Sequence, residues 1–593
     1  MLDPQDRLAL TEALAPPAGF TLAHGVGTTF TLDLETALTV PLALAAKRVE
    51  SSDDALSILD ALRRTEQQVD IFAQAGQISM GQHSSLVALL ERSVHQVAQR
   101  RGLFHPKVWF LRFESDDGET RFRFICSSRN LTQDRSWDVV VQLDGAPGDV
   151  SDERVREQNL PMADLLRRLP DLMIHSLEGT RHARLNELAD QWEQILWELP
   201  DGARELRFHA YGPGANSTID TSGTRSLIVS PFLSDDGLRL LRKDCRRETH
   251  VISRPESFER LRPESLGGLS SYIFDDAANL EDADSAVSEW QRKPLVGLHA
   301  KVIVHDLPRK QSRVLLGSAN ATGAAFRDNT EVMVELVGPV KQFGVKSTLE
   351  ALDQLKEEYA PTGGETSTEQ EEAEHRLEQM LRAIAASPVH MRLRGEGPCD
   401  VSVWSDNESA DSPGVTIEWQ MLRAANVVAG VIPAREEDAH TFAEVPLEQV
   451  TPFILVTAKN GSVTRRTILL ARLLGDFERR RTAVLSEHIT DRASFLRLLT
   501  MMLELAGFGT AAEAAIGDGV FGRFAAASGE SAGLMEALAK ALGYGTDAIA
   551  DVERIIEYIA SDDQQAAEIL PEGFDELWSA VRDAYAMTKR GGA

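Results

Sequence analysis

Two copies of a histidine–lysine pair constrain the fold of this chain more than any other feature of its sequence. His105 and Lys107 form the first copy, and His299 and Lys301 form the second. Both copies stand in strand-like runs, and side chains two residues apart in a strand point to the same face of a sheet. Each copy therefore predicts a strand that presents an imidazole and an ammonium group on one face.

An asparagine follows each pair, in a small turn after a second strand-like run. Asn130 follows residues 122–126, and Asn320 follows residues 314–316. A hairpin would bring each Asn beside its His and Lys. Lys and Asn can hold the non-bridging oxygens of a phosphodiester, and His can attack phosphorus or protonate a leaving oxygen. Two facing half-sites would supply both a nucleophile and an acid, so the sequence predicts a centre without metal or cofactor.

The second copy resembles the signature of the phospholipase D superfamily, His-x-Lys-x4-Asp followed by Gly-Ser-x-Asn. His299, Lys301 and Asp306 have the spacing of the first part, and residues 317–320 read Gly-Ser-Ala-Asn. Residues 329–331, Asn-Thr-Glu, are similar to the downstream Asn-x-Glu stretch of bacterial members. The resemblance covers roughly residues 1–345 and does not extend to residues 390–593.

The first copy departs from that signature at two positions. Arg112 stands where Asp is expected, and Ser127 replaces the Gly. The missing Asp and the Ser-x-Asn-Leu-Thr wording of residues 128–132 resemble the tyrosyl-DNA phosphodiesterase branch, which is active without that Asp. The departure therefore bears on the subfamily more than on catalysis.

The resemblance implies a role for each residue of the two motifs. One histidine forms a covalent phosphohistidine and the other protonates the leaving group, with His105 favoured as the nucleophile over His299. Asp306 is expected to be a structural ion-pair partner. The remaining implied groups are the phosphate clamp of Lys107, Lys301, Asn130 and Asn320, the substrate-binding Ser128 and Ser318, and the carboxylates Glu331 and Asp138, which would orient the imidazoles across the interface between halves.

The expected fold class is α/β, with two phospholipase D-like lobes that form one pseudo-two-fold catalytic core. A small β-rich domain and a helical C-terminal domain are expected after it. The expected boundaries are 1–180 for the first lobe, 181–204 for a connecting helix, 205–345 for the second lobe, 346–388 for an acidic linker that runs into a solvated helix, 389–480 for the β-rich domain and 481–593 for the helical domain.

Hydrophobic periodicity places the individual elements. Residues 55–64 and 237–243 are expected to be helical, and Leu185, Leu188, Trp192 and Ile195 have the helical spacing of the connecting helix. Expected strands include residues 69–72, 107–111, 226–230, 250–252, 299–305, 401–403, 415–421 and 453–456.

Composition limits the classes of partner. The chain has 62 basic and 91 acidic residues and a net charge of −29, so a nucleic acid or an anionic membrane would need a locally basic groove. Three cysteines argue against a disulfide framework or a zinc site and fit a reducing cytoplasm. The acidic N-terminus lacks the build of a secretion signal, and no apolar stretch is long enough for a membrane span, so a cytoplasmic protein is expected.

For several residues a structural interpretation stands beside a functional one. His305 is expected to lie at a strand end or at the surface. Trp109 and Trp137 could stack a base, but core packing is favoured. The basic segment 242–247 could line a nucleic-acid path or form a solvated helix end.

The leading hypothesis is a nuclease or DNA-end phosphodiesterase, with DNA favoured as the substrate. Its context would be a bacterial anti-phage defence or restriction system, with a separate ATPase or helicase as partner protein because the chain has no Walker motif; an oligomer is compatible with the sequence. A phospholipase D-type lipid hydrolase or transferase is the second hypothesis. A non-catalytic scaffold is the third.

Overall fold

The protein is described by a computed structural model that covers most of its first 475 residues. The described residues are 10–44, 65–80, 85–132, 136–149, 152–274, 297–395, 398–407, 413–424, 426–475, 480, 482–483 and scattered positions between 556 and 582. The expected helix at 55–64 and almost all of the expected helical domain at 481–593 lie outside them. No helix among the described residues is long and apolar enough to cross a membrane.

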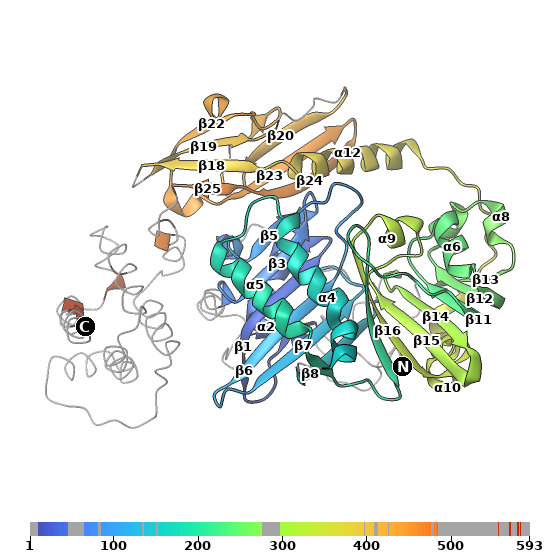
Figure 1. Cartoon of the computed structure of the whole chain (residues 1–593). Helices are drawn as coiled ribbons and strands as arrows, with labels where there is room; N and C mark the ends of the chain where they lie inside the picture. The colour runs from blue at the N-terminus through green and yellow to red at the C-terminus, as the bar shows by residue number, and fades with distance from the viewer. Residues whose placement is uncertain are drawn as a thin grey trace.

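The first half of the molecule is built on a seven-stranded mixed sheet with the strand order β5-β3-β1-β6-β7-β8-β9. Strands β1, β3 and β5 are parallel, and the remaining neighbours are antiparallel. Helices α4 (Glu153–Leu172) and α5 (Gly179–Trp192) lie side by side along this sheet (Figure 1). The strands are β1 (Phe20–Thr29), β3 (Val69–Gln74), β5 (Val94–Val97), β6 (Val108–Ser115), β7 (Thr120–Ser127), β8 (Val140–Pro147) and β9 (Ile195–Trp197).

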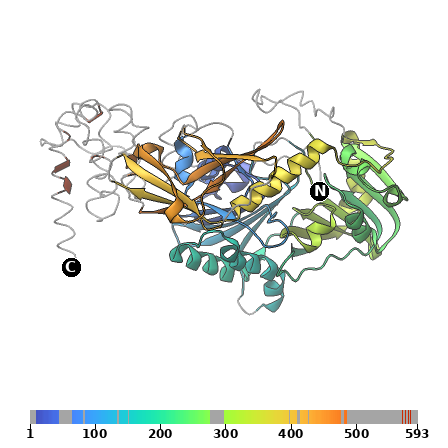
Figure 2. The ribbon, with the colours of Figure 1, turned by 90° about the horizontal axis from the view of Figure 1, so that it is seen from above.

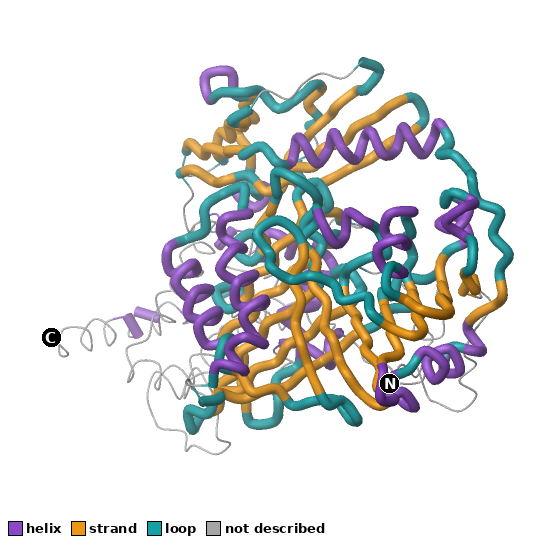
Figure 3. The backbone as a smooth tube through the Cα atoms, turned by 45° about the vertical axis from the view of Figure 1, so that its right-hand side comes forward, coloured by secondary structure: helices purple, strands orange, loops and turns teal. Residues whose placement is uncertain are grey.

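The second half repeats this layout in an eight-stranded sheet of order β10-β16-β15-β14-β11-β12-β13-β17. Strands β11, β12 and β13 are parallel, and β14 runs antiparallel to β11. Helices flank the strands in both halves (Figure 3). The elements are β10 (Glu205–Tyr211), β11 (Gly223–Val229), α6 (Asp235–Arg242), β12 (Cys245–Ser253), α7 (Pro255–Glu259), α8 (Pro263–Leu266), β13 (Leu269–Phe274), β14 (Val302–Leu307), β15 (Gln311–Gly317), α9 (Gly323–Arg327), β16 (Glu331–Pro339), α10 (Val340–Phe343), α11 (Val345–Ala351) and β17 (Lys356–Glu358).

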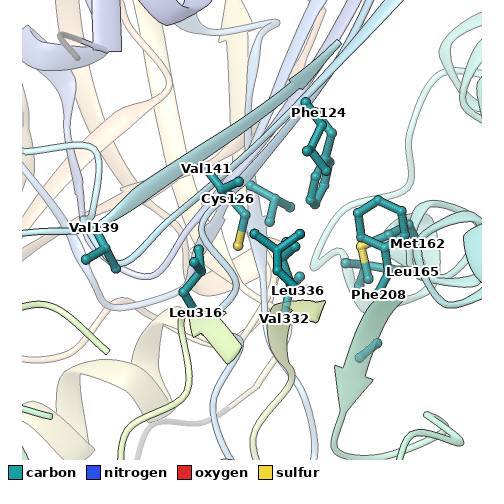
Figure 4. Packing of buried hydrophobic residues seen from close by; sticks show 14 of the residues in the cluster. Phe124, Cys126, Val139, Val141, Met162, Leu165, Phe208, Leu316, Val332 and Leu336 are labelled. Atoms are coloured by element: carbon teal, nitrogen blue, oxygen red, sulfur yellow. The ribbon is translucent and has the colours of Figure 1, made fainter. Parts of the chain in front are cut away.

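One hydrophobic core joins the two halves. Cys126 of β7 packs beside Leu316 of β15 and Val332 and Leu336 of β16 (Figure 4). These side chains are nearly all removed from water, and burial of apolar surface from both sheets stabilises their association. The two sheets therefore share buried apolar side chains next to the ends of β7 and β15.

A cluster of charges is buried under the sheet of the first half. Asp70 of β3 contacts His24 at 3.2 Å, His95 at 2.7 Å and Arg181 at 2.5 Å. Burial raises the pKa of Asp70, but the bonds from His24 and His95 and the charges of His95 and Arg181 outweigh it and hold that pKa below its usual range. The cluster ties α5, through Arg181, to three neighbouring strands.

Residues 389–474 form the strands β18 to β25, in two four-stranded sheets. Helix α12 (Glu369–Ala385) packs along them and begins with a capping box between Thr368 and Glu371 (Figure 2). The strands are β18 (Val389–Arg394), β19 (Cys399–Ser405), β20 (Thr416–Met421), β21 (Val428–Ala429), β22 (His440–Val445), β23 (Phe453–Asn460), β24 (Val463–Leu470) and β25 (Arg472–Leu474).

The β-rich region is bonded to the first half. The side chain of Gln96 donates to the carbonyl of Ile468 at 3.3 Å and accepts from the amide of Leu470 at 2.6 Å. The fully buried Arg480 forms a two-pronged contact with Glu91 at 2.9 and 2.7 Å. The β-rich region therefore continues the packing of the first sheet.

The mixed α/β class predicted from the sequence is confirmed, but the continuous connecting helix is wrong. The connecting helix ends at Trp192, and Ile195–Trp197 forms strand β9 on the edge of the first sheet. The second sheet extends past residue 345, because β17 pairs with β13. Helix α12 is solvated on one side only, since Leu377, Leu381 and Ile384 are buried. The domain boundaries themselves stay predictions.

Candidate active site

Each motif histidine stands in an extended segment just before a strand, rather than inside the strand as predicted. His105 and Lys107 precede β6, and His299 and Lys301 precede β14. Each segment is anchored by the other half of the molecule. The amide of His105 donates to the carbonyl of Thr330, and the amide of His299 donates to the carbonyl of Trp137, both at 2.9 Å. The two halves thus fix one another's histidine backbones.

The side chains cross in the same way. Nδ1 of His105 lies 2.8 Å from Oε2 of Glu331, and Nδ1 of His299 lies 3.1 Å from Oδ1 of Asp138. When Glu331 and Asp138 are ionised they can only accept, so in that state we assign the proton of each neutral ring to Nδ1. That tautomer leaves a lone pair on Nε2 of each ring, on the side away from the carboxylate.

The two serines hold the carboxylates from behind. The hydroxyl of Ser318 donates to Glu331 at 2.5 Å, and the hydroxyl of Ser128 donates to Asp138 at 3.0 Å. Each serine oxygen also accepts from the amide that follows its acidic residue, Val332 or Val139, at 3.0 Å. Both serines are fully buried, so the structure gives them a positioning role; the substrate contact expected from the sequence stays a prediction.

Both motif lysines are buried beside their histidines. Nζ of Lys107 donates to the carbonyl of His105 at 2.9 Å, and Nζ of Lys301 donates to the carbonyl of His299 at 2.5 Å. Burial lowers the pKa of Lys107 well below its usual value, while the negative charges of Glu331 and Asp138 oppose the fall and the positive charge of Lys301 adds to it. Groups from both halves therefore act on one ammonium.

The two asparagines occupy corresponding turns but differ in their contacts. Oδ1 of Asn130 accepts from the amide of Thr31 at 3.3 Å. Oδ1 of Asn320 is buried and, within the part of the chain that the structure describes, has no hydrogen-bond partner. Both turns carry the carboxamide to the end of the strand that neighbours the His and Lys segment, as the hairpin geometry predicts.

The two histidines differ in the charged groups that act on their pKa values. Burial lowers the pKa of His105 well below 6.5, and the charges of Lys107, Lys301 and His299 lower it further. Burial also lowers the pKa of His299, but the hydrogen bond that its ring donates to Asp138 opposes that fall. Burial raises the pKa of Glu331 to about 8, against the charge of Lys107 and the bonds from Ser318 and Asn329. Since His299 and Lys301 act on His105, the two half-sites form one cluster of charges.

Two solved structures are among those similar to this chain. Yeast tyrosyl-DNA phosphodiesterase matches at 14% identity over 58% of this chain and 88% of its own, with a TM-score of 0.35. Phosphatidylserine synthase from Haemophilus influenzae matches at 12% identity over 64% of this chain and 91% of its own, with a TM-score of 0.32. The resemblance to the phospholipase D superfamily lies in the two His-Lys motifs of the sequence. With TM-scores of 0.35 and 0.32, neither overlap indicates a substrate or a reaction for this chain.

No protein-family model matches the sequence, and neither does any curated protein. Among the described residues, no group of three or more His, Cys, Asp and Glu side chains is arranged to hold a metal ion.

In the second half, the local structure explains why the signature has Gly at position 317. A Cβ on Gly317 would stand 2.3 Å from the carbonyl oxygen of Val332, so backbone contact excludes a side chain there. Ser127 takes the corresponding place in the first half, where its hydroxyl donates to the carbonyl of Arg129 at 3.1 Å. The departure from the signature at Ser127 is thus accommodated by the fold.

Sequence reasoning missed a second layer of paired contacts. Oγ1 of Thr29 accepts from the amide of Leu131 at 3.0 Å, and Oγ of Ser230 accepts from the amide of Ala321 at 3.0 Å. These bonds hold the two asparagine turns. The signal that could have found them is a hydroxyl residue at the end of the strand beside each His-Lys segment.

Other residues that the sequence singled out have structural roles. Asp306 accepts hydrogen bonds from Ser312 and from the amide of Val345, so the ion pair expected for it is replaced by neutral donors. His305 is buried in β14 rather than at the surface, and burial lowers its pKa to about 4. Trp109 is buried in the core, as favoured, while Trp137 is partly buried against Phe274 at a ring separation of 4.9 Å.

The basic segment lies at the end of α6 and the start of β12. Arg242 donates to the carbonyls of Ser265 and Gly267. Arg242 and Lys243 also line an open hollow of about 580 Å³, together with Arg239 and Arg262. A nucleic-acid path along this segment stays a prediction.

Proposed function

We propose that this protein is a phosphodiesterase that cleaves nucleic acid through a phosphohistidine intermediate. In this proposal two phospholipase D-like lobes form one pseudo-two-fold catalytic core. The observation that supports it is the crossed arrangement, in which each imidazole is oriented by a carboxylate from the other half and both lysines lie beside them.

His105 is the proposed nucleophile. Its low pKa keeps the ring neutral, and Glu331 holds the Nδ1 proton, so the Nε2 lone pair is free to attack phosphorus. The new N–P bond forms as the bond from phosphorus to the leaving oxygen breaks. Lys107, Lys301, Asn130 and Asn320 then stabilise the negative charge that gathers on the non-bridging oxygens.

His299 is the proposed acid and base. As an imidazolium it gives its Nε2 proton to the leaving oxygen. The neutral ring then takes a proton from water, whose oxygen attacks phosphorus and breaks the N–P bond of the phosphohistidine. His105 leaves with its lone pair restored, and His299 is protonated again, so the cycle closes with side chains alone.

The first motif supports nucleic acid as the substrate, because Arg112 and the wording of residues 128–132 resemble the tyrosyl-DNA phosphodiesterase branch. We further propose a cytoplasmic effector of an anti-phage defence or restriction system, working with a separate ATPase or helicase. That context rests on analogy and on the large region that follows the two halves.

A substrate panel tests the proposal. Single- and double-stranded DNA, RNA and phospholipid vesicles are incubated with wild type and with His299→Ala, with and without EDTA. We expect cleavage of nucleic acid that persists in EDTA and is lost in His299→Ala. Headgroup release from vesicles without nucleic-acid cleavage would replace the proposed substrate by a lipid, and loss of all activity in EDTA would overturn the mechanism.

A further inference from the structure

The edge of the second sheet beside His299 carries two side chains that the mechanism does not use. Strands β11 and β12 are parallel, and their carboxyl ends lie at the same edge as the start of β14, which follows Lys301. Ligands of parallel sheets bind outside the carboxyl ends of the strands. Phe232 comes three residues after β11, the strand next to β14, and Arg254 directly follows β12.

Phe232 is an exposed aromatic ring on a fixed backbone. Its side chain is among the few large apolar groups left open to solvent, with the residue 47% exposed. The carbonyl of Phe232 accepts from the hydroxyl of Ser230 at 2.8 Å, and that same hydroxyl holds the amide of Ala321 at 3.0 Å. Phe232 is thereby tied to the turn that carries Asn320.

Arg254 links the ring to the histidine. Its guanidinium carbon lies 5.3 Å from the centre of the Phe232 ring. Nε and one terminal nitrogen donate to the carbonyl of Leu298, the residue before His299, at 2.9 and 2.7 Å. A positive charge and a flat apolar surface are therefore built together next to the proposed acid.

The first half has neither group at the corresponding places. Thr29 repeats the bonds of Ser230, and its hydroxyl donates to the carbonyl of Thr31, which marks Thr31 as the counterpart of Phe232. Gln74 is the counterpart of Arg254, because its side chain accepts from the amide of Phe104, the residue before His105. In the first half a different ring, that of Phe30, lies 5.0 Å from the ring of His105 and 5.8 Å from Nζ of Lys107, so among the described residues the pairing of an exposed ring with an arginine is found at this place in the second half.

We propose that Phe232 and Arg254 form a subsite for an unpaired nucleotide next to the scissile phosphate, and this rests on the proposed function above. The base stacks on Phe232, and Arg254 attracts the neighbouring phosphate. An aromatic ring accepts any base but needs its face free, so the subsite selects single-stranded substrate. In this proposal the strand continues from the scissile phosphate towards Phe232, on the side of the second half.

Substitutions of Phe232 test the stacking surface. The measured quantity is the ratio of kcat/KM for a single-stranded oligonucleotide to kcat/KM for a small aryl phosphodiester. We expect Phe232→Ala to lower this ratio roughly 10- to 100-fold, Phe232→Leu to lower it nearly as much, and Phe232→Tyr to restore it. Leu196→Ala is the matched control, because Leu196 is equally exposed at 50% but lies on β9 of the other sheet. A substrate with an abasic position beside the scissile phosphate should remove the effect of Phe232→Ala.

Arg254→Gln tests the charge, because Gln reproduces the residue found at position 74. We expect binding of a fluorescent single-stranded oligonucleotide to His105→Ala to weaken when Arg254→Gln is added. The slope of log affinity against log salt should become shallower by about 0.7. A duplex of the same sequence should show no dependence on Phe232.

The outcomes separate this inference from the proposed function. If wild type cleaves single strands and Phe232→Ala leaves both the substrate ratio and the binding unchanged, the subsite is wrong and the function stands. If oligonucleotide binding depends on Phe232 but nothing is cleaved, the subsite stands and the function is wrong. Binding of phospholipid vesicles through Phe232, with no binding of oligonucleotide, would overturn both.

Discussion

The two half-sites share their hydrogen bonds but differ in their surroundings. Glu331 beside His105 is fully buried, whereas the side chain of Asp138 beside His299 is 16% exposed. The bond to His105 is also the shorter of the two, at 2.8 Å against 3.1 Å. A repeated framework thus holds two unlike imidazoles: burial lowers the pKa of both, the charges of Lys107, Lys301 and His299 lower that of His105 further, and the bond to Asp138 opposes the fall at His299. The difference suits a division between nucleophile and acid.

The largest effect should come from removing either ring. We expect His105→Ala and His299→Ala each to lower kcat/KM for an oligonucleotide by about 10⁴-fold or more. A diester with a p-nitrophenolate leaving group needs no acid, so it should restore the first step in His299→Ala and leave His105→Ala inactive. Restoration in His105→Ala alone would reverse the assignment.

Removing the two carboxylates should separate the half-sites further. We expect Glu331→Gln to lower kcat/KM by about 10³-fold, because the amide can donate to Nδ1 and place the ring proton on Nε2. Asp138→Asn should cost about tenfold, since water can reach its partner. Thermal unfolding of both variants controls for stability, and equal losses of activity would contradict the asymmetry.

The comparison extends to the cores of the halves. Asp70 lies in a buried charge cluster, whereas His250, at the corresponding place in β12, is only partly buried against Tyr272. Asp70→Asn should lower the free energy of unfolding by about 3–5 kcal/mol, because it strands Arg181. His250→Asn should cost much less. Urea unfolding measures both.

The sign of the pH effect follows from the lowered pKa of Asp70. The stabilisation is present above the pKa of Asp in the unfolded chain, about 3.9, and is lost as pH falls below it towards the lower folded pKa. Wild type should therefore lose stability in acid more steeply than Asp70→Asn. If wild type and Asp70→Asn lose stability equally steeply in acid, the cluster contributes nothing to the free energy of unfolding.

A smaller pH effect is expected on activity. The pKa of Glu331 is raised to about 8, so its carboxylate forms as pH rises through that value. For the p-nitrophenyl diester, whose leaving group needs no acid from His299, we expect kcat/KM of wild type to rise roughly tenfold between about pH 7 and 9. Glu331→Gln should lack the rise, whereas Asp138→Asn should keep it. If kcat/KM of wild type does not change with pH over this range, ionisation of Glu331 does not control the rate.

Local pattern predicted the residues that gather in the site, because two motifs with the same order and spacing require the same hairpin. The family resemblance implied that Glu331 and Asp138 orient the opposite histidines; each carboxyl group lies at hydrogen-bond distance from that ring, and the catalytic roles stay predictions. Features set by distant partners were beyond it. Ile195–Trp197 became a strand because the edge of β8 was open to pairing, although its spacing suits a helix.

His305 shows the same limit. A histidine near a strand end is usually solvated, but here the neighbouring strands and the elements over them cover it completely. The bonds from Gln96 to β24 join residues that are far apart in sequence, and no local pattern marks them. Burial and long-range pairing, rather than residue type, decide these cases.

The crossed carboxylates have a consequence for the order of biosynthesis. When the ribosome has completed the first sheet, His105 exists but the residue that orients it, Glu331, has not been made. His299 in turn finds Asp138 only when the later strands dock on the earlier ones. A nascent or truncated N-terminal fragment therefore carries a His105 ring that no carboxylate orients. The proposed phosphodiesterase activity cannot begin until translation has passed the second motif.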